Sequence, residues 1–149
     1  MKPFWETKTL LEMDRREWEL LCDGCGICCL EKLQDTETGE VEYTAVACRY
    51  LNTSNCRCRV YADRLQANRK CVQITVDSIS HMSWLPGSCA YRRLAEGKKL
   101  LDWHPLISGD PETVHSCGIS VRDRVISAAY VHPKDIQAYG IEIETETEK

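Results

Sequence analysis

Cysteines dominate the chemistry that this chain could perform. Nine of its ten cysteines fall between Cys22 and Cys89, and four of these nine lie in the eight-residue run CDGCGICC. Cys22, Cys25 and Cys28 are spaced three residues apart, and Cys29 directly follows Cys28. Thiols at this density form disulfides, hold a metal or carry out redox chemistry.

The expected cellular compartment favours metal binding by the cysteines over disulfide formation. The stretch MKPFWETKTLLEMDRREWELL is charged throughout and lacks the apolar core of a signal peptide. No stretch approaches the roughly 18 apolar residues that a transmembrane helix requires. We therefore expect a cytoplasmic protein with no membrane partner. Because disulfides are rare in the cytosol, the pattern favours metal binding over a disulfide framework.

The thiol spacing restricts the kind of metal. Sets made only of thiolates favour zinc, iron–sulfur clusters or copper(I). Zinc modules usually carry two CxxC pairs, and this chain has no second CxxC. Three thiols at i, i+3 and i+6 with a distant fourth are typical of a bacterial [4Fe–4S] site, although that pattern continues with three residues and Cys-Pro, where this chain has Cys29 and Leu30. A metal is therefore expected, and its identity, a [4Fe–4S] cluster or Zn²⁺, stays open.

The number of thiols allows three arrangements. Eight thiols complete two four-cysteine sites and leave one cysteine over. Nine could hold three zinc ions in a bridged cluster, because six terminal and three bridging thiolates supply twelve bonds. Four could hold one iron–sulfur cubane and leave the others for zinc. The side chains of adjacent cysteines point in different directions, so Cys28 and Cys29 serve different metals or share a cluster.

Each arrangement leaves negative charge that is costly to bury without compensation. Six basic residues lie between Cys48 and Cys71, against the single acid Asp63: Arg49, Arg57, Arg59, Arg64, Arg69 and Lys70. We predict that at least two of the five arginines face the cysteines. Arg57 is the best single candidate, because Cys56 and Cys58 flank it. If the alternation of an extended strand turns Arg57 away, Arg49 and Arg64 are the expected compensators. A different reading is a zinc module that binds RNA through Arg57, Arg59, Arg69 and Lys70, although the net charge of −4 argues against nucleic acid in general.

Local signals predict the elements that hold the first cysteines in place. Asp14 and Glu17 form a capping-box pattern for a helix over 15–21, which delivers Cys22 at its end. Gly24 and Gly26 allow a tight turn in which amides approach sulfur. A hairpin is predicted from strands over 30–33 and 41–46 around DTETGE.

The rest of the chain is predicted to alternate turns with short elements. NTSN at 52–55 is a turn, and helices follow over 60–67 and 89–96, the second capped by Ser88 and stopped by Gly97. An ordered loop over 100–115 and a last strand over 121–129 complete the chain. We expect a small irregular α+β domain of short helices and hairpins over 1–149, organised around its cysteines, with an ordered core at about 4–130 and an acidic tail at 140–149.

The loop WHPLISGDPETVH carries the remaining polar candidates. His104, Asp110 and His115 could handle protons or substrate, but Pro105 and Gly109 favour a rigid loop in which the histidines bond to the backbone. No nucleotide fingerprint, P-loop or nucleophile elbow is present. The sequence therefore assigns no reaction.

Several segments together resemble a known family. CDGCGICC, VACRYL, CRC, Cys71 and WLPGSCAYRRLAEGK resemble the bacterial CxxCxxCC proteins of the YkgJ/YcgN group, which are described as zinc- or iron-chelating. LLDWHPLISGDPETVH and GISVR are similar to the YcgN branch, so the resemblance covers roughly residues 4–126. It implies a metal-chelating domain without an assigned reaction. A similar cysteine domain in flagellin lysine methyltransferases implies, by analogy, a redox or methyl-transfer component with an iron–sulfur cluster.

The resemblance also implies a ligand set. The cysteines that match the pattern are Cys22, Cys25, Cys28, Cys29, Cys48, Cys56, Cys58, Cys71 and Cys89. Cys117 lies 28 residues beyond Cys89, where the pattern has no cysteine, and we expect it to bind no metal.

Overall fold

Short helices, each defined by its capping residues, begin the chain. The computed structural model describes residues 2–67, 71, 73–82 and 84–141. The first elements are α1 (Phe4–Thr7), the 3-10 helix η1 (Leu10–Glu12) and α2 (Arg15–Leu20). Asp14 and Glu17 form the reciprocal capping box at the start of α2. The predicted helix is therefore confirmed, one residue shorter than expected.

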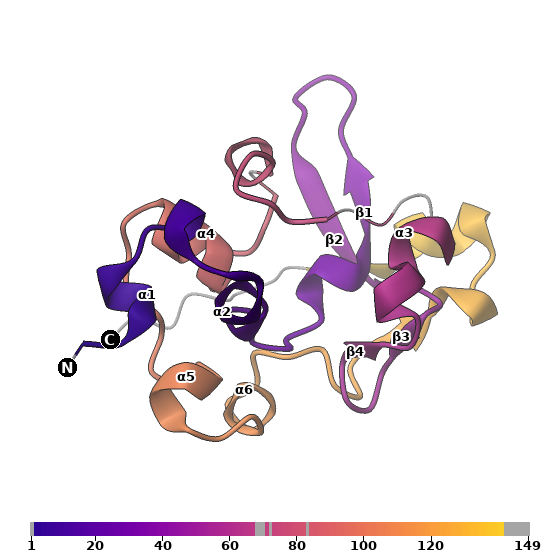
Figure 1. Cartoon of the computed structure of the whole chain (residues 1–149). Helices are drawn as coiled ribbons and strands as arrows, with labels where there is room; N and C mark the ends of the chain where they lie inside the picture. The colour runs from indigo at the N-terminus through magenta and orange to yellow at the C-terminus, as the bar shows by residue number, and fades with distance from the viewer. Residues whose placement is uncertain (1, 68–70, 72, 83, 142–149) are drawn as a thin grey trace.

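The predicted hairpin is also confirmed and forms the centre of the main sheet. A 3-10 turn, η2 (Ile27–Cys29), leads into β1 (Leu30–Gln34), which pairs antiparallel with β2 (Val41–Ala47). Gly39 adopts a φ of 76° in the turn between them. The hairpin projects from the body of the molecule (Figure 1). The other edge of β2 pairs with β5 (Ile126–Ser127) in parallel and with β6 (Gly140–Ile141) antiparallel.

A smaller sheet follows the hairpin. β3 (Leu51–Asn52) pairs with β4 (Arg57–Cys58), and the predicted turn at 52–55 connects them. The Asn52 side-chain oxygen accepts hydrogen bonds from the Ser54 and Asn55 amides. The helix predicted over 60–67 is present as η3 (Tyr61–Asp63) and α3 (Arg64–Ala67). After it come η4 (Ile79–His81) and α4 (Ala90–Ala95).

Three predictions of local structure were wrong. The N-cap of α4 is Cys89 rather than Ser88. The loop predicted over 100–115 contains α5 (Pro105–Ser108) and α6 (Thr113–Ser116); Pro105 suits the first turn of α5, and the His104 ring caps it by accepting the Leu106 amide. Of the strand predicted over 121–129, only β5 forms, and η5 (Ala128–Tyr130) and η6 (Pro133–Tyr139) follow it.

The α+β class is confirmed, with short helices beside antiparallel strands. None of the described helices is long and apolar enough to cross a membrane. The one-domain prediction stays a prediction. In the predicted acidic tail, Gly140 and Ile141 belong to β6, and 142–149 lie outside the described residues.

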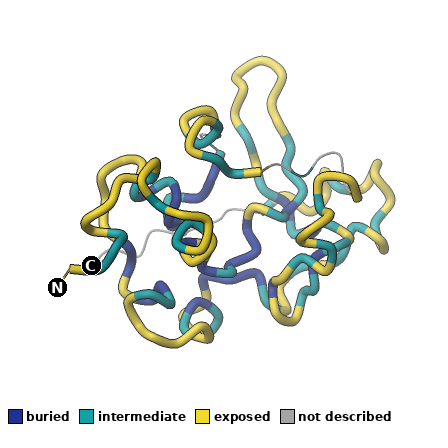
Figure 2. Tube along the Cα trace, viewed as in Figure 1, coloured by how far each residue is buried: buried dark blue, intermediate teal, exposed yellow. Residues whose placement is uncertain are grey.

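Two groups of buried side chains form the interior. The sheet-side core contains Cys25, Ile27, Leu30, Ala47, Leu51, Cys56, Leu101, Trp103, Val114, Ile119 and Val121. The helix-side core contains Leu21, Ala90, Tyr91 and Leu100, with partly buried residues such as Trp18 packed around them. Leu21 and Cys25 belong to different cores, so the run CDGCGICC passes from one core to the other. Figure 2 shows the buried stretches of the trace near the middle of the molecule.

Candidate metal centre

The run CDGCGICC folds as a knuckle that presents backbone amides to sulfur. Gly24 and Gly26 adopt φ values of 78° and 77°, as predicted from their positions. The Ile27 amide donates to Cys25 Sγ at 3.5 Å, and Asp23 Oδ1 accepts the Cys25 amide at 2.9 Å. Amides that point at sulfur stabilise a thiolate and orient it toward a metal.

Gly26 is also required by packing. A Cβ atom at this position would lie 2.8 Å from Val121 Cγ2 and 3.2 Å from the Cβ of Cys56. The Val121 amide donates to the Cys25 carbonyl at 2.9 Å, which holds the segment after α6 against the knuckle. The second glycine of the motif therefore has a steric role that the sequence alone did not reveal.

All ten cysteines lie among the described residues and carry free thiols. Four of them, which we name the first thiol set, interact electrostatically: Cys22, Cys25, Cys28 and Cys89. Loss of hydration is the largest cause of the raised pKa of Cys22, Cys25 and Cys89, and the negative charge of Cys28 raises each pKa further. Cys22 and Cys28 are exposed, whereas Cys25 is buried.

Four other cysteines form the second thiol set: Cys29, Cys48, Cys58 and Cys71. The Cys48 amide donates to the Cys29 carbonyl at 2.7 Å, because the chain pairs here at the end of the hairpin. Burial raises the pKa of Cys71, the Arg64 charge opposes this, and the charges of Cys48 and Cys58 reinforce it. The pKa of Cys29 is raised by its hydrogen bond to Cys28, then by burial and by the charges of Cys28, Cys48 and Cys71.

The adjacent cysteines Cys28 and Cys29 join the two sets. The Cys29 thiol acts as hydrogen-bond donor to Cys28, which lowers the pKa of Cys28 to about 7. The charge of Lys32 acts in the same direction, against the effect of burial. A thiol with a lowered pKa is readily available as a thiolate ligand.

The two sets fit a metal in donor type and number, because four thiolates are the usual complement of a structural zinc ion or a [4Fe–4S] cluster. Across the described part of the chain, no group of three or more Cys, His, Asp or Glu side chains is arranged to hold a metal ion. The sets are therefore groups of neighbouring thiols, and their sulfurs must converge to coordinate a metal.

Two cysteines stand apart from both sets. Cys56 is buried in the sheet-side core with a φ of 60°, and its sulfur interacts with Ser120 and Arg122. Its predicted role as a ligand stays a prediction. Cys117 follows α6, is exposed, and donates to the Val114 carbonyl at 3.6 Å.

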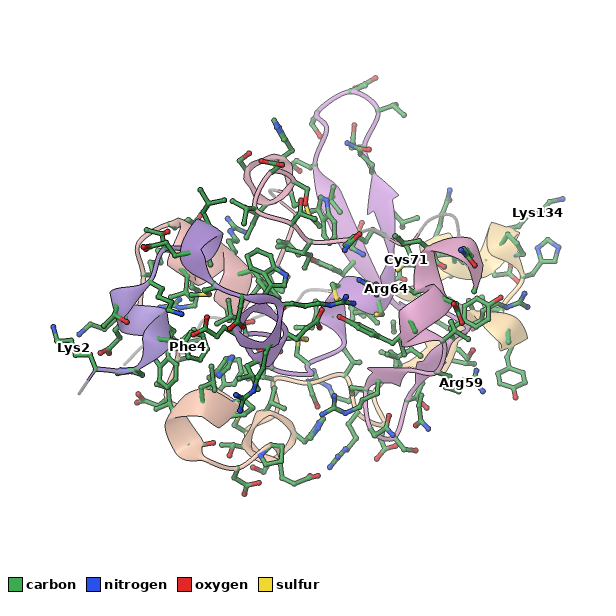
Figure 3. All side chains as sticks on the ribbon, viewed as in Figure 1. Lys2, Phe4, Arg59, Arg64, Cys71 and Lys134 are labelled. Atoms are coloured by element: carbon green, nitrogen blue, oxygen red, sulfur yellow. The ribbon has the colours of Figure 1, made fainter. Side chains whose placement is uncertain are left out.

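The arginines expected to compensate the thiolates lie in different places. Arg64, half-buried on α3, stacks on the Tyr61 ring at 4.2 Å, and its charge lowers the pKa of Cys71. Figure 3 labels Arg64 and Cys71 beside each other. Arg57 is exposed on β4, and the exposed Arg59 donates to the carbonyl of Arg49, which is also exposed.

Arg69 and Lys70 lie outside the described residues. Both roles predicted for the basic segment, charge compensation and RNA binding, therefore stay predictions.

Lys32 is a cation beside the thiols that sequence reasoning missed. Its Nζ donates to the carbonyls of Cys28 and Leu30, both at 2.9 Å. It also lies 4.5 Å from the centre of the Trp84 ring and 5.6 Å from that of Tyr43. Aromatic faces attract an ammonium group. The available signal was its position four residues after Cys28, on a strand that follows the motif.

The histidines of the WHPLISGDPETVH segment bond within the protein. His104 is buried; its Nε2 donates to the Leu21 carbonyl at 2.8 Å and its Nδ1 accepts the Leu106 amide at 3.0 Å. These bonds fix the residue before Cys22 to α5. His115 pairs with Ser120 at 2.7 Å, while Asp110 accepts the Glu112 amide at 2.9 Å in its own turn.

Comparison with known proteins agrees with this cysteine architecture. The family model described as "CxxCxxCC: Putative zinc- or iron-chelating domain" matches residues 21–90. A UPF0260 protein of Allorhizobium ampelinum is 52% identical over 138 residues, covering 93% of this chain and 87% of its own length. One from Granulibacter bethesdensis is 54% identical over 131 residues, or 88% and 79% of the two chains.

A third UPF0260 protein, from Marinobacter nauticus, is 52% identical over 133 residues, which cover 89% of this chain and 90% of that protein. No solved structure matches the chain. The match at 21–90 contains the knuckle and all eight thiols of the two sets, and the relatives extend the similarity over most of the chain. The chain therefore belongs to the CxxCxxCC family of zinc- or iron-chelating domains, among its UPF0260 proteins.

Proposed function

We propose that this protein chelates two metal ions, one in each thiol set. The observation that carries the proposal is the grouping of eight cysteines into two sets of four that meet at Cys28 and Cys29. Four thiolates complete a closed zinc site. A reducing compartment, which we expect to be the cytoplasm, keeps such thiols available for metal.

The protein supplies backbone amides that orient the sulfurs and positive charges that offset the thiolates. Backbone amides of the knuckle and at the start of α4 face the sulfurs of Cys25 and Cys89. Lys32 and Arg64 place positive charge beside the junction and beside the second set. A bound metal would link segments that are far apart in the sequence, such as the knuckle and Cys89. Metal binding then becomes part of the folding free energy.

An iron–sulfur cluster in the first set is the second candidate. Cys22, Cys25 and Cys28 have the ferredoxin-like step, and Cys89 is the distant fourth thiol that this pattern needs. A redox or methyl-transfer role would require such a cluster. Single metal ions and an iron–sulfur cluster differ in colour and in elemental composition, so measurements on one protein preparation distinguish the two candidates.

The test is elemental analysis with a visible spectrum on anaerobically purified protein. We expect two metal ions per chain, with loss of one ion in Cys89→Ser and loss of one in Cys58→Ser. Cys56→Ser is the matched control, because Cys56 lies close to Cys58 in sequence but outside both sets, and it should keep both ions. A metal-free wild-type chain, or equal losses in all three variants, would refute the proposal.

A further inference from the structure

Asp23 is a buried carboxylate inside the cysteine motif. Its residue is 8% exposed. Oδ1 accepts the Cys25 amide at 2.9 Å, and Oδ2 is buried with no hydrogen-bond partner among the described residues. A buried carboxylate oxygen is costly unless a donor or a cation satisfies it. The position therefore calls for a hydrogen-bond donor or a cation.

The surroundings of Asp23 are the first thiol set. After the larger effect of burial, its charge raises the pKa of both Cys22 and Cys25. It also opposes ionisation of Cys28 and Cys89. The carboxylate thus lies within electrostatic reach of all four thiols.

Nearby basic groups do not satisfy Oδ2. The charge of a protonated His104 would lower the pKa of Asp23. Burial lowers the pKa of His104, however, and both of its ring nitrogens form hydrogen bonds with the backbone. Lys32 donates to two backbone carbonyls. A metal cation held by the first set would satisfy the free oxygen.

We propose that Asp23 Oδ2 is a ligand of the metal ion held by the first thiol set. This inference rests on the proposed function and deepens it, because it makes the first set a mixed sulfur and oxygen site and leaves the second set with sulfur alone. In a [4Fe–4S] cluster the four thiolates leave no iron for the carboxylate, whereas at a single ion Asp23 takes the place of one of the four thiolates, because four thiolates already close a zinc site. An oxygen ligand instead suits a single divalent cation such as Zn²⁺ or Fe²⁺, and disfavours Cu(I).

Cobalt(II) is the probe, because its visible bands report the number of thiolate ligands and the coordination geometry separately. The full chain is loaded anaerobically under reducing conditions, as wild type, Asp23→Asn, Asp23→Glu and Asp102→Asn. Asparagine keeps an oxygen that accepts the Cys25 amide but removes the negatively charged oxygen that would bind the metal. Glutamate keeps a carboxylate, and Asp102 is an exposed carboxylate that serves as the control. The second set reports in each variant whether the chain still folds.

We expect Asp23→Asn to weaken one of two cobalt sites by about 10- to 100-fold or more, the range that loss of an outer partner already produces. The ligand-field bands of that site should shift, Asp23→Glu should restore part of the binding, and Asp102→Asn should match wild type. Unchanged binding in Asp23→Asn, or weaker binding with unchanged ligand-field bands, would overturn Asp23 as a ligand. Wild-type protein that binds no cobalt would overturn the proposed function as well.

Discussion

Lys32 is a positive charge fixed beside the cysteines. Its ammonium group is held by the carbonyls of Cys28 and Leu30 and faces the rings of Trp84 and Tyr43. The held position keeps the charge beside the junction of the two thiol sets. Negative charge at a metal–thiolate centre is costly to bury, so a fixed cation there favours metal retention.

We predict that Lys32→Met weakens zinc binding by about 10- to 100-fold, because methionine keeps much of the apolar stem but removes the charge. Lys32→Arg should recover most of the loss, since guanidinium also stacks on aromatic rings. Competition against a chromophoric chelator measures both affinities. Equal affinity in Lys32→Met and wild type would rule out the role in charge compensation.

The knuckle and the elements behind it permit a matched test at the scale of elements. Gly24 and Gly26 have almost the same φ, but only Gly26 faces close neighbours. Alanine at either position costs about 1–2 kcal/mol for the left-handed backbone. Gly26→Ala should lose about 1–3 kcal/mol more, because the new Cβ meets Val121 and Cys56. Urea unfolding of the metal-loaded protein measures both losses, and equal losses would contradict the packing role of Gly26.

Elements specified by neighbouring residues could be predicted from the sequence. The capping box of α2, the turn glycine of the hairpin and the knuckle glycines all depend on a few adjacent positions, and the structure confirms each. The short extent of β5 and the presence of β6 could not be predicted, because two-residue strands depend on pairing with β2 rather than on a pattern of their own. α5 depends on a histidine cap, which the capping rules for Ser, Thr, Asp and Asn do not include.

The candidate site could also be predicted only in part. Spacing alone placed Cys22, Cys25 and Cys28 together, since three-residue steps in a knuckle converge. Which distant thiol joins which set depends on tertiary packing: Cys89 arrives on α4 and Cys71 from beyond α3. Lys32 and Asp23 were missed because their roles depend on burial and on neighbours that a spacing pattern does not contain.

At the scale of the whole molecule, the cysteine run connects two separate hydrophobic cores. Leu21 belongs to the helix-side core, and Cys25 and Ile27 belong to the sheet-side core. Metal in the first set would tie Cys89, which packs against the helix-side core, to the knuckle. Metal binding can contribute about 10–16 kcal/mol in small zinc modules, which is comparable to the entire stability of a typical domain, about 5–15 kcal/mol.

We therefore predict that chelation under reducing conditions unfolds the protein. The loss should appear in the near-ultraviolet circular dichroism, because Trp18 packs on Tyr91 in the helix-side core at 4.8 Å between ring centres. Addition of zinc after removal of the chelator should restore the signal. A thermal transition that is the same with and without metal would contradict this coupling.

The stoichiometry of zinc binding tests the account most directly. Reduced, metal-free protein is titrated with Zn²⁺ and the species are weighed by native mass spectrometry. Two sets of four thiols predict saturation at two zinc ions per chain, with Cys56 taking no part. Saturation at three would instead indicate a bridged nine-cysteine cluster, and saturation at one or none would contradict the division of the thiols into two sets.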